Sequence, residues 1–245
     1  MLKKLTTGLI FSSILATSAL VAADIKIYCG STMANAMKEI ATNMETKHGV
    51  SIEIVKGGSA KLYKKLSSEK NGDLYLPGSD SYIKKNKKDG YLGFGKYIGF
   101  NQAVIITQKG NPKGVKTLDD FTKASIKTAL GAPKSGSIGK IAKAVLIKHK
   151  DKAFYNSIAK KSLLASNSSE IIEGLESKKI DAALSWKASA AGKNFTIVKI
   201  PDNISPRKKL KFTLLKFSKN KKVAKEIINY AASDEGKTIM KKYGF

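Results

Sequence analysis

The feature that most constrains this chain is a repeated junction, in which a predicted strand leads through a short polar run into a predicted helix. The runs are Gly30-Ser31-Thr32, Gly57-Gly58-Ser59, Lys134 to Lys140 and Asn167-Ser168-Ser169. A helix that begins at such a run points unpaired backbone N–H groups and the positive end of its dipole at whatever lies in front, and the hydroxyls add further donors. Four such junctions predict one shared anion-binding site. The alternative interpretation is that these residues serve only as helix N-caps.

Two periodicities define the elements around these junctions. Residues 24–29 alternate with period two, and apolar residues recur at helical spacing from Met33 to Met44, before Gly49 in a helix-ending position. Further strands are predicted at 50–54, 73–76, 102–107, 127–130, 180–186 and 195–200, and further helices begin near Lys61, Ile141 and Ile171. This alternation predicts a mainly parallel, doubly wound α/β architecture, with the ligand at the carboxyl ends of the strands.

The first 23 residues have the pattern of a secretory signal peptide. Lys3 and Lys4 precede an apolar segment that is short for a membrane span, and the small residues Val21 and Ala23 suit cleavage after Ala23. The alternative is an uncleaved anchor. Cleavage would leave 222 residues (245 − 23) and predicts a periplasmic protein, large enough for one large domain or two lobes.

Several kinds of catalytic site are disfavoured. Cys29 is the single cysteine and fits a buried strand position, while His48 and His149 are the only histidines and both stand in lysine-rich contexts near predicted helix ends. The central run fails the pattern of a nucleotide phosphate-binding loop, because Lys134 stands where glycine is required and Ile141 where serine or threonine is required. We therefore expect no enzyme activity, no cofactor and no metal site.

The chain is strongly basic, with a formal net charge of +26, or +24 once Lys3 and Lys4 are removed with the signal peptide. Nearly all of the positive charge is lysine, and Arg207 is the only arginine. Proteins that recognise nucleic acid usually employ arginine for bidentate and stacking contacts, so no nucleic-acid partner is expected. A positive field of this size favours encounters with small anions and with anionic lipid.

The order of the motifs carries a resemblance to a known family. These motifs are Cys29-Gly30-Ser31-Thr32, Asn35 to Ala41, Gly49-Val50, Gly58 to Leu62, Gly72 to Tyr75 and Lys242 to Phe245. Together they cover nearly the whole mature chain, which resembles the molybdate-binding periplasmic proteins of ABC importers. The resemblance implies a type II periplasmic binding protein with two α/β lobes, each a mainly parallel sheet flanked by helices, joined by two crossing segments. Lobe 1 would comprise residues 24–101 and 206–245, and lobe 2 residues 102–205.

The resemblance also implies a function. A monomer would close on a small tetrahedral oxyanion, molybdate or tungstate, and deliver it to a membrane permease. The implied binding positions are Ser31, Thr32 and Ser59 in lobe 1 and Ser137, Ile138, Ser168 and Trp186 in lobe 2. Thr32 keeps the hydroxyl of the family's serine, whereas Trp186 replaces a tyrosine with a larger side chain whose only polar group is an N–H donor. The identity of the anion is therefore open.

Two alternatives remain at this stage. A protonated phosphate would need a hydrogen-bond acceptor as well as donors. Asp80 and Glu170 are the acidic residues nearest the junctions, so phosphate or a phosphonate is the first alternative. Their simpler roles are an N-cap for Asp80 and a first-turn charge for Glu170. The second alternative is a ligand-sensing module that presents its lobes to a membrane receptor.

Overall fold

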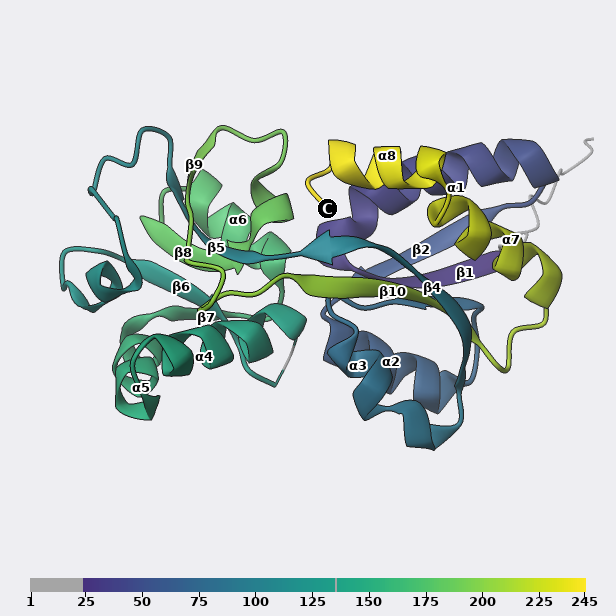
Figure 1. The fold of residues 1–245 in the computed structure, drawn as a ribbon, viewed down its shortest axis with the longest axis horizontal. Coiled ribbons are helices and arrows are strands. Elements are labelled where there is room, and N and C mark those ends of the chain that lie inside the picture. The colour runs from purple at the N-terminus through teal and green to yellow at the C-terminus, as the bar shows by residue number, and fades with distance from the viewer. Residues whose placement is uncertain (1–23, 135) are drawn as a thin grey trace, which may run out of the picture.

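The computed structural model describes residues 24–134 and 136–245, and the predicted signal peptide lies outside this part of the chain. The protein consists of two α/β lobes that lie side by side along its longest axis (Figure 1). Each lobe is built on one five-stranded sheet with helices on both faces. Within the described residues, no helix is long and apolar enough to cross a membrane.

The first lobe contains the beginning and the end of the described chain. Its sheet has the order β2 (Ile52–Gly57), β1 (Ile25–Gly30), β3 (Leu74–Leu76), β10 (Lys208–Leu215) and β4 (Leu92–Asn101). One face packs against α1 (Ala34–His48), α7 (Lys221–Ala231) and α8 (Asp234–Lys242), and the other against α2 (Ser59–Glu69) and α3 (Ser81–Lys85). A short helix, η1 (Ser31–Met33), joins β1 to α1, and η2 (Lys87–Asp89) follows α3.

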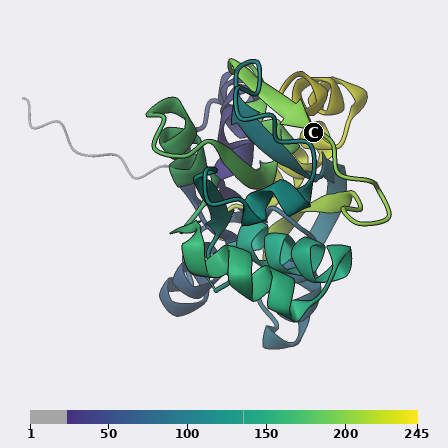
Figure 2. The same cartoon turned by 90° about the vertical axis from the view of Figure 1, so that its left-hand side faces the viewer.

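The second lobe contains the middle of the chain. Its sheet has the order β7 (Leu163–Ala165), β6 (Thr128–Gly131), β8 (Ala182–Trp186), β5 (Ala103–Gln108) and β9 (Phe195–Val198). Helices α4 (Ser137–His149) and α5 (Lys152–Lys161) cover one face and α6 (Ser168–Glu176) covers the other, as Figure 2 shows from the end of this lobe. Two further short helices, η3 (Leu118–Thr122) and η4 (Lys187–Ala190), flank the sheet.

Both sheets are mainly parallel, as expected, and each contains one antiparallel strand. In lobe 1 the pairs β1–β2 and β1–β3 are parallel, while β10 runs antiparallel to both of its neighbours. In lobe 2 the pairs β6–β7 and β6–β8 are parallel, while β5 runs antiparallel to β8 and β9. The two antiparallel strands, β5 and β10, are those that directly follow a crossing between the lobes, so each enters its sheet in the opposite sense.

The described chain crosses between the sheets twice. Only Gln102 separates β4 from β5, and the second crossing lies between β9 and β10, within residues 199–207. The side-chain amide of Gln102 donates to the Asp202 carboxylate at 2.7 Å and to the Ser205 carbonyl at 2.9 Å. The Ser205 hydroxyl donates back to the Ala103 carbonyl at 2.7 Å. The two connections are therefore hydrogen-bonded to each other, and we propose them as the boundaries between the lobes.

Burial follows the predicted pattern on β1 and extends beyond it. Ile25, Ile27 and Cys29 face the core formed with α1, as the period of two predicts. Tyr28 points to the opposite face and is also fully buried, because α2 covers that face. Burial raises the pKa of the Cys29 thiol, so this cysteine is kept in its neutral, unreactive form.

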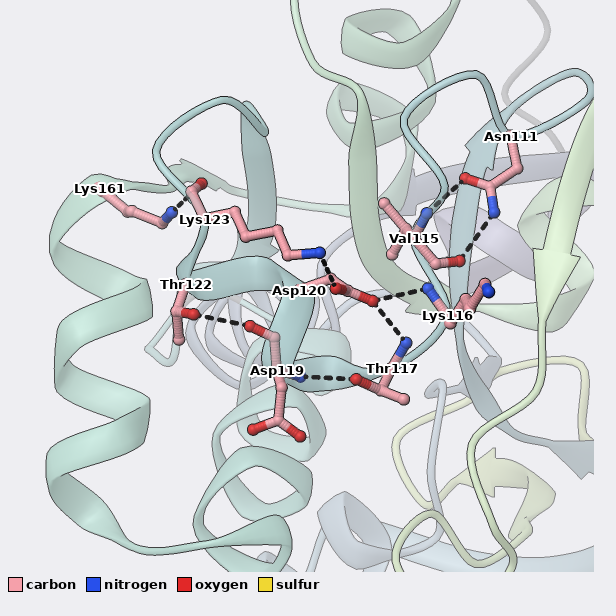
Figure 3. A network of polar contacts seen from close by, with 9 residues as sticks. All are labelled: Asn111, Val115, Lys116, Thr117, Asp119, Asp120, Thr122, Lys123 and Lys161. Carbon is pink, nitrogen blue, oxygen red and sulfur yellow. Dashed lines mark hydrogen bonds and ion pairs between the residues drawn. The ribbon is translucent and has the colours of Figure 1, made fainter.

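A polar network stabilises the loop around η3 in lobe 2 (Figure 3). Thr117 accepts from the backbone N–H of Asp119, and the Asp120 carboxylate accepts from the backbone N–H groups of Lys116 and Thr117 at 2.7 and 2.9 Å. An ion pair with Lys123 and these two backbone N–H groups lower the pKa of Asp120 to about 2. The network fixes a segment that has no strand partner.

Candidate anion-binding site between the lobes

The four polar junctions of the sequence meet at one small cavity between the lobes. Its volume is about 20 Å³. Lobe 1 contributes Gly30 to Met33, Gly57 to Ser59 and Gly78, and lobe 2 contributes Gly136 to Ile138, Asn167, Ser168 and Trp186. The fold therefore brings together all seven residues that the resemblance implied.

Three of the helices that begin here have open N-termini. These are η1, which leads directly into α1, together with α2 and α4. The residues before them are Gly30, Gly58 and Gly136, and none of these glycines forms a side-chain cap. At α6, by contrast, the Asn167 side chain accepts from the backbone N–H groups of Ser169 and Glu170. Uncapped first turns leave N–H groups and the positive dipole end available to an anion.

The helix starts predicted from sequence were placed too late. Helix α2 begins at Ser59 rather than near Lys61, α4 at Ser137 rather than at Ile141, and α6 at Ser168 rather than at Ile171. The predicted starts lie two to four residues inside the helices, because the serines that resemble caps in the sequence are the first helical residues and the caps are the preceding Gly58, Gly136 and Asn167. As a consequence the implied ligand positions are the first residues of the helices themselves.

Ser59 is the most extensively bonded residue of the cavity. Its hydroxyl accepts from the backbone N–H of Gly78 at 3.1 Å and donates to the Ser137 hydroxyl at 3.3 Å, across the boundary between the lobes. Its carbonyl accepts from the Tyr75 phenol at 2.9 Å. Burial raises the pKa of Tyr75, so this phenol stays protonated and able to donate. Ser59 is thereby held in one position at the start of α2.

Trp186 closes the cavity from the carboxyl end of β8. Its side chain is 1% exposed, and its indole N–H has no acceptor among the residues that the structure describes. Buried polar groups are usually paired, and an unpaired donor on a cavity wall is a candidate ligand contact. The sequence predicted that Trp186 ends a strand, and the structure confirms this placement.

Gly78 is a cavity residue that the sequence did not reveal. A Cβ atom at this position would lie 2.2 Å from the Ser137 Oγ and 3.6 Å from the Trp186 Nε1, so a side chain here would displace the Ser137 hydroxyl of the other lobe. The sequence showed Pro77-Gly78 only as the end of a strand. Its second role depends on residues from the other lobe, which no local pattern reports.

Gly139, in the central run, has a packing role. A Cβ atom here would lie 2.1 Å from the carbonyl oxygen of Ala132, because α4 packs closely on the loop after β6. The glycine is thus required by the approach of a helix to a strand end and does not line the cavity.

Neither of the acidic residues considered from sequence lines the cavity. Asp80 forms an ion pair with Lys84 at 2.8 Å, and the Glu170 carboxylate accepts from the backbone N–H of Ser166 at 2.6 Å. Asp80 occupies the N-cap position of α3, as expected, but its side chain makes no cap hydrogen bond, and the Ser79 hydroxyl accepts from the backbone N–H of Ser81 instead. Glu170 lies in the first turn of α6, as expected.

The electrostatics of the cavity come from dipoles. Of the described residues that line it, none carries a charge, and the polar groups are hydroxyls, one amide, one indole N–H and backbone N–H groups. Nowhere in residues 24–134 and 136–245 do three or more histidine, cysteine or acidic side chains come close enough to hold a metal ion. Such a site can donate hydrogen bonds to every oxygen of a small anion but offers no carboxylate to a protonated one.

A larger space, the outer chamber, adjoins this cavity. It has a volume of about 260 Å³, and Ser31, Thr32 and Ser168 line both spaces. The remaining wall comes from Ala34, Asn35, Lys56, Ser169, Ile172, Glu173, Glu176, Ala188, Ser189, Ala191, Lys193 and Tyr243. The chamber therefore lies between α1, α6 and η4 and opens from the side of the cavity that holds Thr32.

Comparisons with known proteins agree with this arrangement. Two relatives align over most of their lengths. A putative binding protein of Haemophilus influenzae is 24% identical over 246 residues, covering 100% of this chain and 98% of its own. A putative ABC transporter substrate-binding lipoprotein of Bacillus subtilis, YvgL, is 26% identical over 228 residues, covering 90% of this chain and 85% of its own.

Solved structures with the same fold carry names that point to different ligands. The periplasmic molybdate-binding protein of Azotobacter vinelandii superposes with a TM-score of 0.78 at 13% identity, covering 90% of this chain and 97% of its own. The sulfate-binding protein SubI of Mycobacterium tuberculosis gives 0.79 at 16% identity, with 90% and 85% covered. Peb3 of Campylobacter jejuni gives 0.71 at 24% identity, with 90% and 98% covered.

These likenesses establish the fold as that of a two-lobed periplasmic binding protein. The model of a family described as bacterial extracellular solute-binding proteins matches residues 25–245, which is the whole of both lobes. The chain therefore belongs to the bacterial extracellular solute-binding proteins.

Proposed function

We propose that this protein is the periplasmic solute-binding component of an ABC importer and that it captures a fully deprotonated tetrahedral oxyanion between its lobes. The observation that carries the proposal is the cavity itself. Uncapped helix N-termini and hydroxyls from both lobes converge on it, and no charged side chain lines it among the described residues. The importer role is supported by the B. subtilis relative, whose name describes an ABC transporter substrate-binding lipoprotein.

The donor set selects ligands by their protonation state. Molybdate, tungstate and sulfate carry no proton at neutral pH and can accept hydrogen bonds at every oxygen. A phosphomonoester is in the same state above its second pKa of about 6. Inorganic phosphate keeps at least one proton, and among the described residues no carboxylate lines this cavity to accept it. A hydroxyl that accepted this proton could no longer donate to the same oxygen, which costs free energy. The molybdate and tungstate implied by the sequence resemblance fit this rule, and so does the head group of an ester.

On this proposal, binding of the anion closes the cleft between the two lobes. Ser31, Thr32 and Ser59 approach the anion from lobe 1, and Ser137, Ile138, Ser168 and Trp186 approach it from lobe 2. Neither lobe alone supplies a complete set of donors. The closed arrangement would then be the form recognised by a membrane permease, which is how ligand occupancy would be reported to the importer.

Titration calorimetry of the mature protein, unfolded to remove bound ligand and then refolded, tests this function. The panel is molybdate, tungstate, sulfate, methyl phosphate and inorganic phosphate at pH 8. We expect at least one proton-free tetrahedral dianion to bind, and inorganic phosphate to bind at least tenfold more weakly than that anion. Absence of binding by every member, or phosphate as the tightest ligand, would contradict the proposal.

A further inference from the structure

The outer chamber gives the site a second compartment. Ser31, Thr32 and Ser168 line both the 20 Å³ cavity and the 260 Å³ chamber, so the two spaces adjoin at these three residues. A free inorganic oxyanion consists of one central atom and its oxygens, and it has no atoms that could enter the larger space. Binding sites for organic ligands begin at roughly 300 Å³. At about 260 Å³ the chamber lies just below this range, so it suits a short organic chain rather than a larger ligand.

The wall of the chamber is polar and holds charges of both signs. Lys193 is neutralised by an ion pair with Glu176 at 2.5 Å. Lys56 and Glu173 also line the chamber, are exposed, and form no ion pair within the described part of the chain. A chain with a net charge would be attracted by one of these two groups and repelled by the other. A hydroxyl group can donate to the Glu173 carboxylate or accept from the Lys56 ammonium, so an uncharged chain with several hydroxyls can form hydrogen bonds with both side chains.

An unpaired hydroxyl on the chamber wall provides an independent indication. Ser189, in η4, is 9% exposed, and its hydroxyl oxygen is buried without a hydrogen-bond partner among the described residues. Leaving such a group unpaired costs free energy, and a ligand hydroxyl in the chamber could become its partner once the Ser189 side chain turns to a rotamer that faces the chamber. Tyr243 reaches the same wall from the end of the chain, and its phenol donates to Glu39 at 2.8 Å.

We infer that the ligand is a phosphomonoester or phosphonate whose tetrahedral head occupies the cavity and whose short hydroxylated carbon chain occupies the outer chamber. This inference rests on the proposed function, since it assigns the head group to the same donors. It adds the chemical class of the ligand and assigns the chain to the wall formed by Lys56, Glu173 and Ser189.

Paired ligands separate the contribution of the head from that of the chain. Methyl phosphate and sn-glycerol 3-phosphate have the same phosphomonoester head, and only the second carries a hydroxylated chain. We expect glycerol 3-phosphate to bind the refolded, ligand-stripped protein about tenfold to a hundredfold more tightly than methyl phosphate, molybdate or sulfate in calorimetry at pH 8. Equal affinity for glycerol 3-phosphate and methyl phosphate would overturn the inference, while binding of molybdate or methyl phosphate in that case would leave the proposed function intact.

A chamber-filling variant completes the test. Ser169 is exposed at the start of α6 and lines the chamber but not the cavity, so Ser169→Trp should remove the preference for glycerol 3-phosphate and leave the affinity for methyl phosphate within about twofold. Ser68→Trp, on the exposed side of α2 and outside both spaces, is the matched control and should change neither affinity. A retained preference in Ser169→Trp would show that the chain does not occupy the chamber.

Discussion

The Ser59 hydroxyl donates to the Ser137 hydroxyl with 3.3 Å between the two Oγ atoms, and this hydrogen bond joins the first residues of two helices from different lobes. Both helices lack a side-chain cap at this end. The two dipoles therefore point toward the same small space, an arrangement that is unfavourable for the helices alone and favourable once an anion lies between them.

Replacing Ser59 with alanine should weaken binding of the cognate oxyanion by roughly tenfold to a hundredfold, or about 1.5–3 kcal/mol, because one hydrogen bond to a charged acceptor is lost. The Gly78 N–H would also lose its acceptor. Titration calorimetry measures the effect. Ser68→Ala in the same helix is the control, and equal affinities for the two variants would remove Ser59 from the site.

Replacing Trp186 with phenylalanine should cost a similar factor in affinity, since the indole N–H has no acceptor among the described residues and would be available to the anion. Trp186 is the only tryptophan of the chain, so intrinsic fluorescence of the parent should change when the cognate anion binds. Lys87→Ala, on an exposed surface, should leave affinity and fluorescence response unchanged. A Trp186→Phe variant with parental affinity would limit this residue to packing.

Replacing Gly78 with alanine should hinder closure. The added methyl group would lie 2.2 Å from the Ser137 Oγ, so either this hydroxyl turns away and loses its hydrogen bond from Ser59 or the lobes stay further apart. Small-angle scattering of the parent should show a smaller radius of gyration with saturating anion than without it, and the variant should show a smaller decrease together with weaker binding. Gly90→Ala is the control for replacing a glycine by alanine, because a methyl group at Gly90 would meet no other atom. The positive backbone φ of 79° at Gly90 strains the alanine locally, away from the boundary between the lobes. An unchanged radius in the parent despite confirmed binding would indicate a preformed site.

Asp120 should make stability depend on pH in the acid range. Its pKa is lowered from 3.8 to about 2 in the folded protein by Lys123 and by the backbone N–H groups of Lys116 and Thr117, so its contribution is present above about pH 4 and is lost as the pH falls toward 2. Asp120→Asn should lower the free energy of unfolding by roughly 1–2 kcal/mol at pH 7.

Denaturant unfolding at pH 7 and pH 2.5 measures this difference. The gap between parent and Asp120→Asn should shrink at the lower pH. Lys123→Ala keeps the two backbone hydrogen bonds, so its loss at pH 7 should be smaller than that of Asp120→Asn. A gap that is the same at both pH values would mean that the Asp120 charge does not stabilise the folded state.

Export provides a further expectation. Cleavage after Ala23 would give a mature chain that begins at Asp24, and intact-mass measurement of the exported protein would establish this. Retention of residues 1–23 on the exported protein would support the uncleaved anchor instead.

Local patterns predicted most of the framework. Alternation identified β1 and helical spacing identified α1, whose end at Gly49 is confirmed by a left-handed φ of 63°. The long strands β4 and β10 were missed. In β4, glycines interrupt the alternation of apolar and polar residues that predicts a strand. Its aromatic residues Phe94, Tyr97 and Phe100 are exposed, so they do not mark a buried face. The pairing of β4 with β10 also contains register shifts.

The sequence by itself determined the alternating strands and helices, the polar helix starts and, through a family resemblance, the seven residues that meet at the cavity. Only the tertiary structure decided which of those donors remain available. Ser59 and Ser137 are 78 residues apart in the chain, and the steric requirement at Gly78 comes from side chains of the other lobe. The chamber likewise depends on how α1, α6 and η4 are placed. Periodicity reports the environment of a residue within its own element, whereas cavity shape and hydrogen-bond satisfaction arise from contacts between elements that are distant in sequence.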